Sequence, residues 1–329
     1  MRSNLFRTTI AFPTLRGIIR TSPHWHLIFA VQKPVLSIRH TISQRPYNMA
    51  SAKTEALYQK DGHLYTHAAP LSSLSPLSSY PAETQALFKP PQGTEPYILT
   101  TPSTIFHAQG GGQPTDTGTI TPRAKEDGTP KFVVHQVRKI DPAILHLGVF
   151  EPADAKFQEG EELMQNIDVK KRILHSRLHT AGHVIGLAIN MLSKTPSNPP
   201  SPYDIPSTIK DGKASHYPSA AFVEFTGIIP ATAKPFIQAK VDELVTQDLP
   251  VHIHFWSEDE AGRKCIGGVD GAAVPEGETD VRVVDLGGLG SYPCGGTHVR
   301  SLGELGKVVV RNVKGKKGIS KVGYEVAES

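Results

Sequence analysis

An apolar stripe between residues 168 and 194 restricts the fold more than any other feature. Apolar residues recur there at intervals of three and four, the period of an amphipathic helix that buries one side: Leu174, Leu178, Ala181, Ile185, Ala188 and Leu192. The next segment, PSNPPSPYDIP, has five prolines in eleven residues, and proline lacks the amide proton that a helix needs. The sequence therefore predicts one long, buried helix that ends before this segment.

The regions on either side of this helix predict an α+β fold. Before it, EPYILTT, KFVVHQVRK and AILHLG are short apolar or alternating runs separated by turn residues, a pattern typical of a small β-barrel or sandwich. After it, SAAFVEFTG and VHIHFW are expected to be strands, and KPFIQAKVDELVTQ a helix. We therefore expect a small β-barrel domain over residues 55–165 and an α/β domain over residues 166–329.

Residues 1–54 form a separate region by charge. They hold eight Lys or Arg and no acid, and Glu55 is the first carboxylate. Without them, 27 basic residues stand against 31 acidic ones, so the formal charge changes from +4 to about −4. An Arg-rich, acid-free leader is typical of a mitochondrial transit peptide. Met49 is an alternative start, and a chain that begins there is expected in the cytoplasm. A chain that keeps residues 1–48 would be directed to mitochondria. The other explanation is that the leader is only an extended gene model.

Composition excludes some classes of protein. No apolar run approaches the roughly 20 residues that span a bilayer, so we expect no membrane segment. The chain has two cysteines, Cys265 and Cys294, too few for a disulfide framework, which favours a reducing compartment.

Two histidines share one face of the predicted helix. His179 and His183 in RLHTAGHVI are four residues apart, so their side chains would lie about 6 Å apart and could bind one cation. Alone, this spacing also occurs by chance. Thr180 stands where metalloproteases of the H-E-x-x-H type carry their glutamate, which argues against that chemistry.

A second ligand pair lies more than a hundred residues downstream, in PCGGTHV. Cys294 and His298 offer a sulfur and a nitrogen, and the two glycines between them allow a tight bend that aims both inward. The alternative is a buried thiol and a surface histidine. Two pairs of zinc-type ligands favour a single compact site.

These motifs together resemble a known family. HTAGH and PCGGTH, with FHAQGGGQPTDTG upstream and KASHYPSAAFVEFTG between them, are similar to the AlaX proteins, free-standing relatives of the editing domain of alanyl-tRNA synthetase. The ending GELGKVVVRNVKGKKGISKVGYEV resembles the second additional domain of alanyl- and threonyl-tRNA synthetases. The resemblance covers roughly residues 55–326, with the motifs in the family's order.

The resemblance implies an editing domain with one zinc ion per chain, held between a helix and a glycine loop by His179, His183, Cys294 and His298. A catalytic zinc keeps one position open, so we expect one of the four ligands to be weak. Which ligand is weak stays open, as does whether the ion polarises an ester, activates water or only holds a group in place.

The resemblance also implies substrate contacts in the glycine motif. We expect them at Gly111, Gly112, Gln113 and Thr115, although GGGQP is also an ordinary tight turn. Thr180, His216 and Asp116 are candidates for orienting the ligands or for catalysis, with a turn role preferred for Asp116.

The implied reaction is hydrolysis, in trans, of alanine tRNA mischarged with serine or glycine. A pocket for alanine cannot reject these neighbours strongly, so a second hydrolytic site supplies the accuracy. The basic run RNVKGKKGISK predicts tRNA contacts at Lys314, Lys316 and Lys317, unless it is only a solvated hairpin tip. We expect no obligate protein partner. The alternatives are a non-catalytic, zinc-stabilised tRNA-binding module and a zinc hydrolase of small esters.

Overall fold

A computed structural model describes residues 53–124, 128–267 and 279–327 of the chain. The predicted leader, residues 1–54, lies almost entirely outside the described residues. None of the helices in these ranges is long and apolar enough to cross a bilayer.

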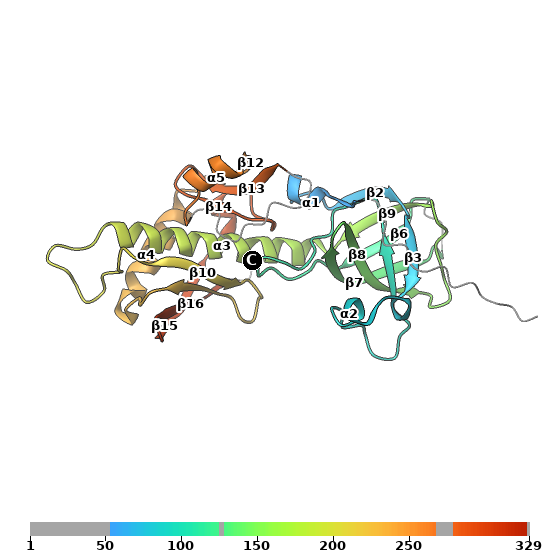
Figure 1. Ribbon diagram of the computed structural model, residues 1–329, viewed down its shortest axis with the longest axis horizontal. Helices are drawn as coiled ribbons and strands as arrows, with labels where there is room; N and C mark the ends of the chain where they lie inside the picture. The colour runs from blue at the N-terminus through green and yellow to red at the C-terminus, as the bar shows by residue number, and fades with distance from the viewer. Residues whose placement is uncertain (1–52, 125–127, 268–278, 328–329) are drawn as a thin grey trace, which may run out of the picture. The chain divides into compact units, whose positions relative to one another are not determined.

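The first part is a curled antiparallel sheet of seven strands (Figure 1). Their order across the sheet is β2 (Thr66–Pro70), β9 (Glu162–Ile167), β6 (Gly118–Pro122), β7 (Lys131–Ile140), β8 (Ala143–Glu151), β4 (Tyr97–Thr100) and β3 (Ser73–Pro76). Among the described residues, the edge strands β2 and β3 are not paired with each other. The predicted barrel is therefore an open, curled half-barrel.

The sheet encloses its own apolar core because its strands alternate inward and outward residues. Ile120, Phe132 and Leu163 are completely buried in that core. Short elements surround it: the strand pair β1 (Glu55–Ala56) and β5 (Ser103–Thr104), and the helices α1 (Leu57–Lys60), η1 (Leu77–Ser79) and α2 (Ala82–Gln85).

The long helix exists as predicted. Helix α3 spans Val169–Lys194, and the side chain of Asp168 caps it by accepting from the backbone N–H of Lys171 at 3.2 Å. Thr195 follows as the C-terminal cap, directly before the proline-rich segment. Leu178, Ile185 and Ala188 of the predicted stripe are fully buried.

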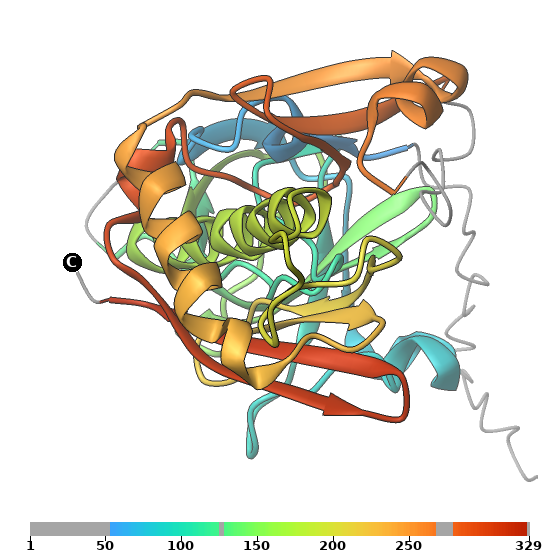
Figure 2. The same cartoon turned by 90° about the vertical axis from the view of Figure 1, so that its left-hand side faces the viewer.

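Two further sheets lie on either side of α3, as Figure 2 shows in a view nearly along the helix axis. One has the order β10 (Lys210–Ser215), β11 (Phe222–Thr226), β16 (Ile319–Val326) and β15 (Val308–Lys316). The other has the order β12 (Val251–Ser257), β13 (Asp280–Leu286) and β14 (Ser291–Pro293).

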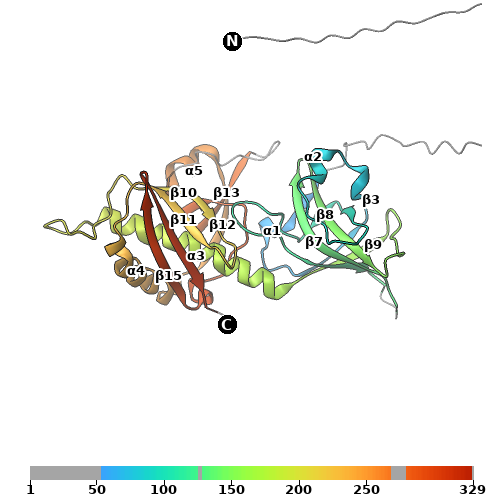
Figure 3. The same cartoon turned by 90° about the horizontal axis from the view of Figure 1, so that it is seen from below.

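The four-stranded sheet packs against α3 (Figure 3), and helix α4 (Lys234–Thr246) joins the same core. The remaining helices are η2 (Ala231–Ala233), α5 (Glu258–Lys264) and η3 (Leu302–Leu305). A mixed α/β architecture results, and it places one face of α3 beside the turn that follows β14.

Candidate metal centre and its pocket

Helix α3 supplies the first two predicted ligands. The rings of His179 and His183 lie on the same face with their centroids 5.2 Å apart and nearly parallel planes. The chain folds this way because the apolar stripe turns the opposite face of α3 into the core. Both imidazoles consequently face the turn after β14.

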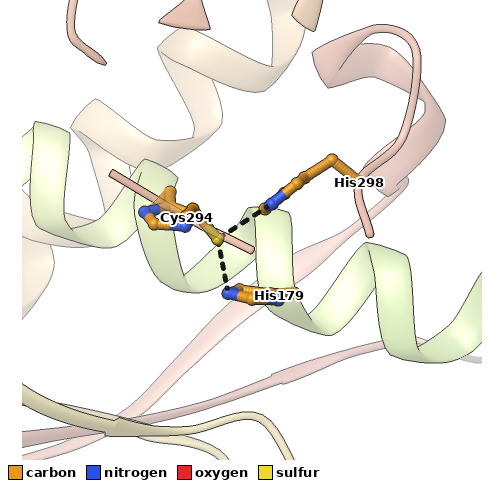
Figure 4. A group of neighbouring side chains, drawn as sticks. His179, Cys294 and His298 are labelled. Atoms are coloured by element: carbon orange, nitrogen blue, oxygen red, sulfur yellow. Dashed lines mark hydrogen bonds between the residues drawn. The ribbon is translucent and has the colours of Figure 1, made fainter. Parts of the chain in front are cut away.

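That turn supplies the other two ligands. Sγ of Cys294 lies 3.4 Å from Nε2 of His179 and 3.3 Å from Nε2 of His298 (Figure 4). With His183, the four ligand atoms lie within 4.8 Å of one another. Gly296 makes this approach possible, because a Cβ at that position would come within 2.2 Å of the His179 ring. The structure therefore brings all four residues together.

The spacing of the ligand atoms suits a metal ion. In a tetrahedral site with metal–nitrogen distances of about 2.0 Å and a metal–sulfur distance of about 2.3 Å, neighbouring ligand atoms are about 3.5 Å apart. The two sulfur–nitrogen distances are close to that value. Nε2 of His183 is buried and has no hydrogen-bond partner among the described residues. An ion at this place would satisfy it, so the group could bind one metal ion.

Gln113 fixes the orientation of His179. Its Oε1 accepts from Nδ1 of His179 at 2.7 Å and from the backbone N–H of Thr297 at 3.0 Å. Its Nε2 donates to Oγ1 of Thr297 at 2.8 Å, and that hydroxyl is also paired with Ser176. Because the His179 proton is held on Nδ1, the Nε2 lone pair points toward Cys294. Such partners set both the tautomer and the basicity of a ligand.

Thr180 plays the matching part for His298. Its hydroxyl lies 3.1 Å from Nδ1 of His298 and accepts from the backbone N–H of Val299 at 3.3 Å. Nε2 of His298 is thereby left to face the cluster. Two of the three histidines thus have a protein partner on the ring nitrogen that faces away from the sulfur.

Burial controls the protonation of the cluster. It lowers the pKa of His179 and His298 well below the usual histidine value, with neighbouring histidines as a further cause. It also lowers the pKa of His183 to about 4, so the imidazoles are neutral at pH 7 with lone pairs available. Burial raises the pKa of Cys294, although the nearby Arg282 opposes this shift. An ion would therefore displace a proton from the thiol.

A pocket of about 630 Å³ opens onto this cluster. His179, His183 and Cys294 line it, together with Gly111 and Gly112 of the glycine motif. His298 does not contribute to its lining. A ligand in the pocket can consequently approach the cluster from the side of the other three residues.

The glycine motif needs its glycines because β10 approaches it closely. Gly112 has a φ of +78°, and a Cβ there would lie 2.6 Å from the carbonyl oxygen of Ala214. The backbone N–H of His216 donates to the Gly112 carbonyl at 2.9 Å. This contact attaches the end of β10 to the wall of the pocket.

His216 lies in the pocket with a defined tautomer. Oη of Tyr324 donates its only proton to the Leu178 carbonyl at 2.9 Å, so it must accept from Nδ1 of His216 at 2.6 Å. Nε2 of His216 therefore carries a lone pair. The ring stacks on His179 with a centroid distance of 4.2 Å, and burial lowers the pKa of His216 to about 3.

Other predicted residues lie outside the pocket lining. Gln113 is completely buried with protein partners at both ends, and Oγ1 of Thr115 accepts from the backbone N–H of Val137 at 2.8 Å. Asp116 forms a buried ion pair with Arg172 and accepts from the backbone N–H of His107 at 2.7 Å. This pair ties the glycine motif to the first turn of α3.

The predicted tRNA-binding lysines lie on a different surface. Lys314, Lys316 and Lys317 are exposed around the turn that joins β15 to β16.

Some residues of the site were not predicted. Thr297 lies inside PCGGTHV, so its position could have suggested that it supports a neighbouring ligand. Asp211 and Tyr292 also line the pocket, and no pattern in the sequence pointed to them.

Comparison with known proteins agrees with these motifs. The family model described as the threonyl and alanyl tRNA synthetase second additional domain matches residues 281–321, which include Cys294 and His298. The alanyl-tRNA editing protein AlaX-M of Methanosarcina barkeri is 27% identical over 214 residues, which cover 65% of this chain and 82% of that protein.

Alanine–tRNA ligases are also similar. That of Methanosphaera stadtmanae is 29% identical over 230 residues, or 69% of this chain and 24% of the ligase. That of Pyrobaculum calidifontis is 31% identical over 218 residues, or 64% of this chain and 22% of the ligase. The chain thus spans about a quarter of the length of these ligases. Together the matches support an AlaX-type family.

Proposed function

We propose that this chain, of AlaX type, is a zinc-dependent hydrolase that removes serine, and to some extent glycine, from mischarged alanine tRNA. The observation that carries the proposal is the His₃Cys group at the wall of a pocket large enough for an aminoacyl ester. The AlaX-M relative is named as an alanyl-tRNA editing protein, which supports the same reaction class.

Zinc suits the donor set better than other common ions. Imidazole and thiolate ligands favour zinc, whereas magnesium and calcium prefer oxygen. His179, His183, Cys294 and His298 would hold the ion. When bound, it would supply Lewis-acid polarisation of an ester carbonyl or lower the pKa of water to about 7.

The chain's own residues would orient the reactants. The backbone at Gly111 and Gly112 would form one wall against the substrate, while Gln113 and Thr180 would keep two imidazoles aimed at one point. Nε2 of His216 faces the same pocket as a hydrogen-bond acceptor for the substrate or for water. We assign Asp116 a positioning role, because its ion pair with Arg172 fixes the glycine motif.

The exposed lysines would meet the tRNA backbone. Lys314, Lys316 and Lys317 have no acidic residue beside them in the turn, and such contacts give affinity that falls with salt. Replacing all three with alanine should weaken tRNA binding and reduce its salt dependence. We also propose that the chain is divided into domains at residues 55–165 and 166–329 and that it acts in the cytoplasm, with residues 1–48 directing a form to mitochondria.

The deciding experiment uses the full chain, purified and loaded with zinc. It is incubated with serine-, glycine- and alanine-charged alanine tRNA, and the release of each amino acid is measured. We expect release of serine and survival of the alanine ester. His183→Ala should abolish release, whereas His252→Ala, at an exposed position of β12, should not.

Two other results would redirect the assignment. Binding of charged and uncharged tRNA without any hydrolysis would point to a zinc-stabilised binding module. Hydrolysis of small esters alone would point to a different substrate class.

A further inference from the structure

The pocket continues beyond the ligand cluster along α3. Gly182 and Gly186 lie on the same face as His179 and His183, because residues three and four apart are neighbours on a helix. Without side chains at these positions, the pocket extends toward Asp211 and Tyr292. Gly186 is three residues past His183, or about 4.5 Å further along the helix axis.

Tyr292 presents an unused hydroxyl at this end of the pocket. Its side chain in β14 is only 6% exposed, and its Oη has no hydrogen-bond partner among the described residues. A buried hydroxyl without a partner is unfavourable. The phenol is therefore a donor without a partner beside Gly186, a residue that lines the pocket.

Asp211 supplies an acceptor beside it. A Cβ at Gly186 would lie 3.5 Å from Oη of Tyr292 and 3.7 Å from Oδ1 of Asp211, so both oxygens border the same small space. Among the residues that the structure describes, the carboxylate receives only long hydrogen bonds from Asn190, at 3.3 and 3.4 Å. Both oxygen atoms consequently have capacity for another partner.

We propose that Asp211 and Tyr292 form a subsite that binds a hydroxyl group of the substrate. A hydroxyl can accept from the phenol and donate to the carboxylate through a single atom. An ammonium group could donate to both side chains but could not accept the proton of the phenol, and an anion would be repelled by the carboxylate.

The identity of the substrate rests on the proposed function. Two hydroxyls of a mischarged tRNA have the right chemistry: the side-chain hydroxyl of serine, and the free sugar hydroxyl beside the ester. Both lie a few bonds from the carbonyl that would approach the cluster. The experiment separates them.

The test compares Tyr292→Phe and Gly186→Ala with the wild type, each as the full, zinc-loaded chain. The first variant removes only the hydroxyl. The second fills the space with a methyl group that makes ordinary contacts, so the fold tolerates it. Tyr203→Phe, on a ring that stacks against Phe236 outside the pocket, is the matched control. Metal content and thermal midpoint are measured for every variant.

We expect kcat/KM for serine-charged tRNA to fall about 3- to 10-fold in Tyr292→Phe, the effect of losing one neutral hydrogen bond. Gly186→Ala should lower it at least as much, and Tyr203→Phe should not change it. If the serine hydroxyl is bound, glycine-charged tRNA is unaffected by Tyr292→Phe. If the sugar hydroxyl is bound, Tyr292→Phe lowers kcat/KM equally for serine- and glycine-charged tRNA. With a substrate that lacks this sugar hydroxyl, Tyr292→Phe and the wild type then have the same kcat/KM.

Values within twofold of the wild type for both pocket variants, on both substrates, would overturn the subsite and leave the proposed function standing. If the wild type hydrolyses no charged tRNA, the proposed function fails instead. The subsite is then tested by calorimetry with a stable amide, seryl-3′-amino-3′-deoxyadenosine. At least threefold weaker binding to Tyr292→Phe would support it, and equal or absent binding would refute it.

Discussion

Replacing Gln113 with alanine should weaken zinc binding through His179. Gln113 is completely buried and accepts from Nδ1 of His179 at 2.7 Å and from the Thr297 N–H at 3.0 Å. The alanine variant leaves both donors unpaired and frees the imidazole to change its tautomer. Loss of such a partner typically reduces metal affinity by about 10- to 100-fold, or roughly 1.4–2.7 kcal/mol.

The same substitution should also destabilise the fold. Two buried N–H groups without partners cost about 1–3 kcal/mol each, so we expect the free energy of unfolding to fall by roughly 2–6 kcal/mol without metal. Gln113→Glu keeps an acceptor for both donors. Its zinc affinity should therefore be at least that of the wild type.

The assay is competition for zinc against a chromophoric chelator, with urea unfolding measured in parallel. Gln165→Ala is the control, because Gln165 is equally buried but bonds to Thr101 and Thr104 inside the curled sheet. That variant should lose stability and keep its zinc affinity. If Gln113→Ala bound zinc within threefold of the wild type, the claim that Gln113 aims His179 at the ion would be wrong.

Three further predictions concern stability. Asp116→Ala should lower the free energy of unfolding by about 3–5 kcal/mol in urea titrations, because it leaves the Arg172 charge buried and unpaired. A chelator should lower the thermal midpoint, since an ion at 100 times its Kd adds about 2.7 kcal/mol; His183→Ala should show a much smaller change. Burial lowers the pKa of His107 and His146 from 6.5 to about 4, so the unfolded chain binds more protons below pH 6.5. The free energy of unfolding should therefore fall as pH falls from 6.5 to 4, and between pH 7 and 5 each histidine should contribute about 2 kcal/mol of this loss. Urea titrations that give the same free energy of unfolding at pH 7 and pH 5 would contradict this prediction.

Periodic patterns predicted most of the elements. The stripe from Leu174 to Leu192 predicted α3 to within a residue at its start, because one face of the helix must be apolar to pack. The alternating run at residues 251–256 predicted β12, which spans Val251–Ser257. Local periodicity reports which face is buried, and this was enough to find these elements.

Closure of the first sheet could not be predicted in the same way. Whether β2 and β3 meet depends on the curvature and number of strands, and the alternation within each strand contains no information about either. The sequence was therefore compatible with a barrel, and the structure shows an open curled sheet.

Some residues of the candidate site could be predicted from the sequence, and others could not. The four candidate ligands were predicted from the two motifs together with their resemblance to the AlaX family, because the spacing of His179 and His183 alone also occurs by chance. The contacts of Gln113 could not be predicted, because they depend on a partner from a distant part of the chain. Gln113 reaches Thr297, 184 residues away, and no local pattern indicates such a contact.

The Gln113–His179–Cys294 arrangement also constrains when the chain could first bind the proposed ion during synthesis. A ribosome makes the histidine pair of α3 more than a hundred residues before the cysteine. Until residues 294–298 have emerged and folded back, the nascent polypeptide offers only half of the candidate ligands, and Gln113 lacks its partner Thr297. We therefore expect metal loading to be a late event that accompanies the final docking of the chain.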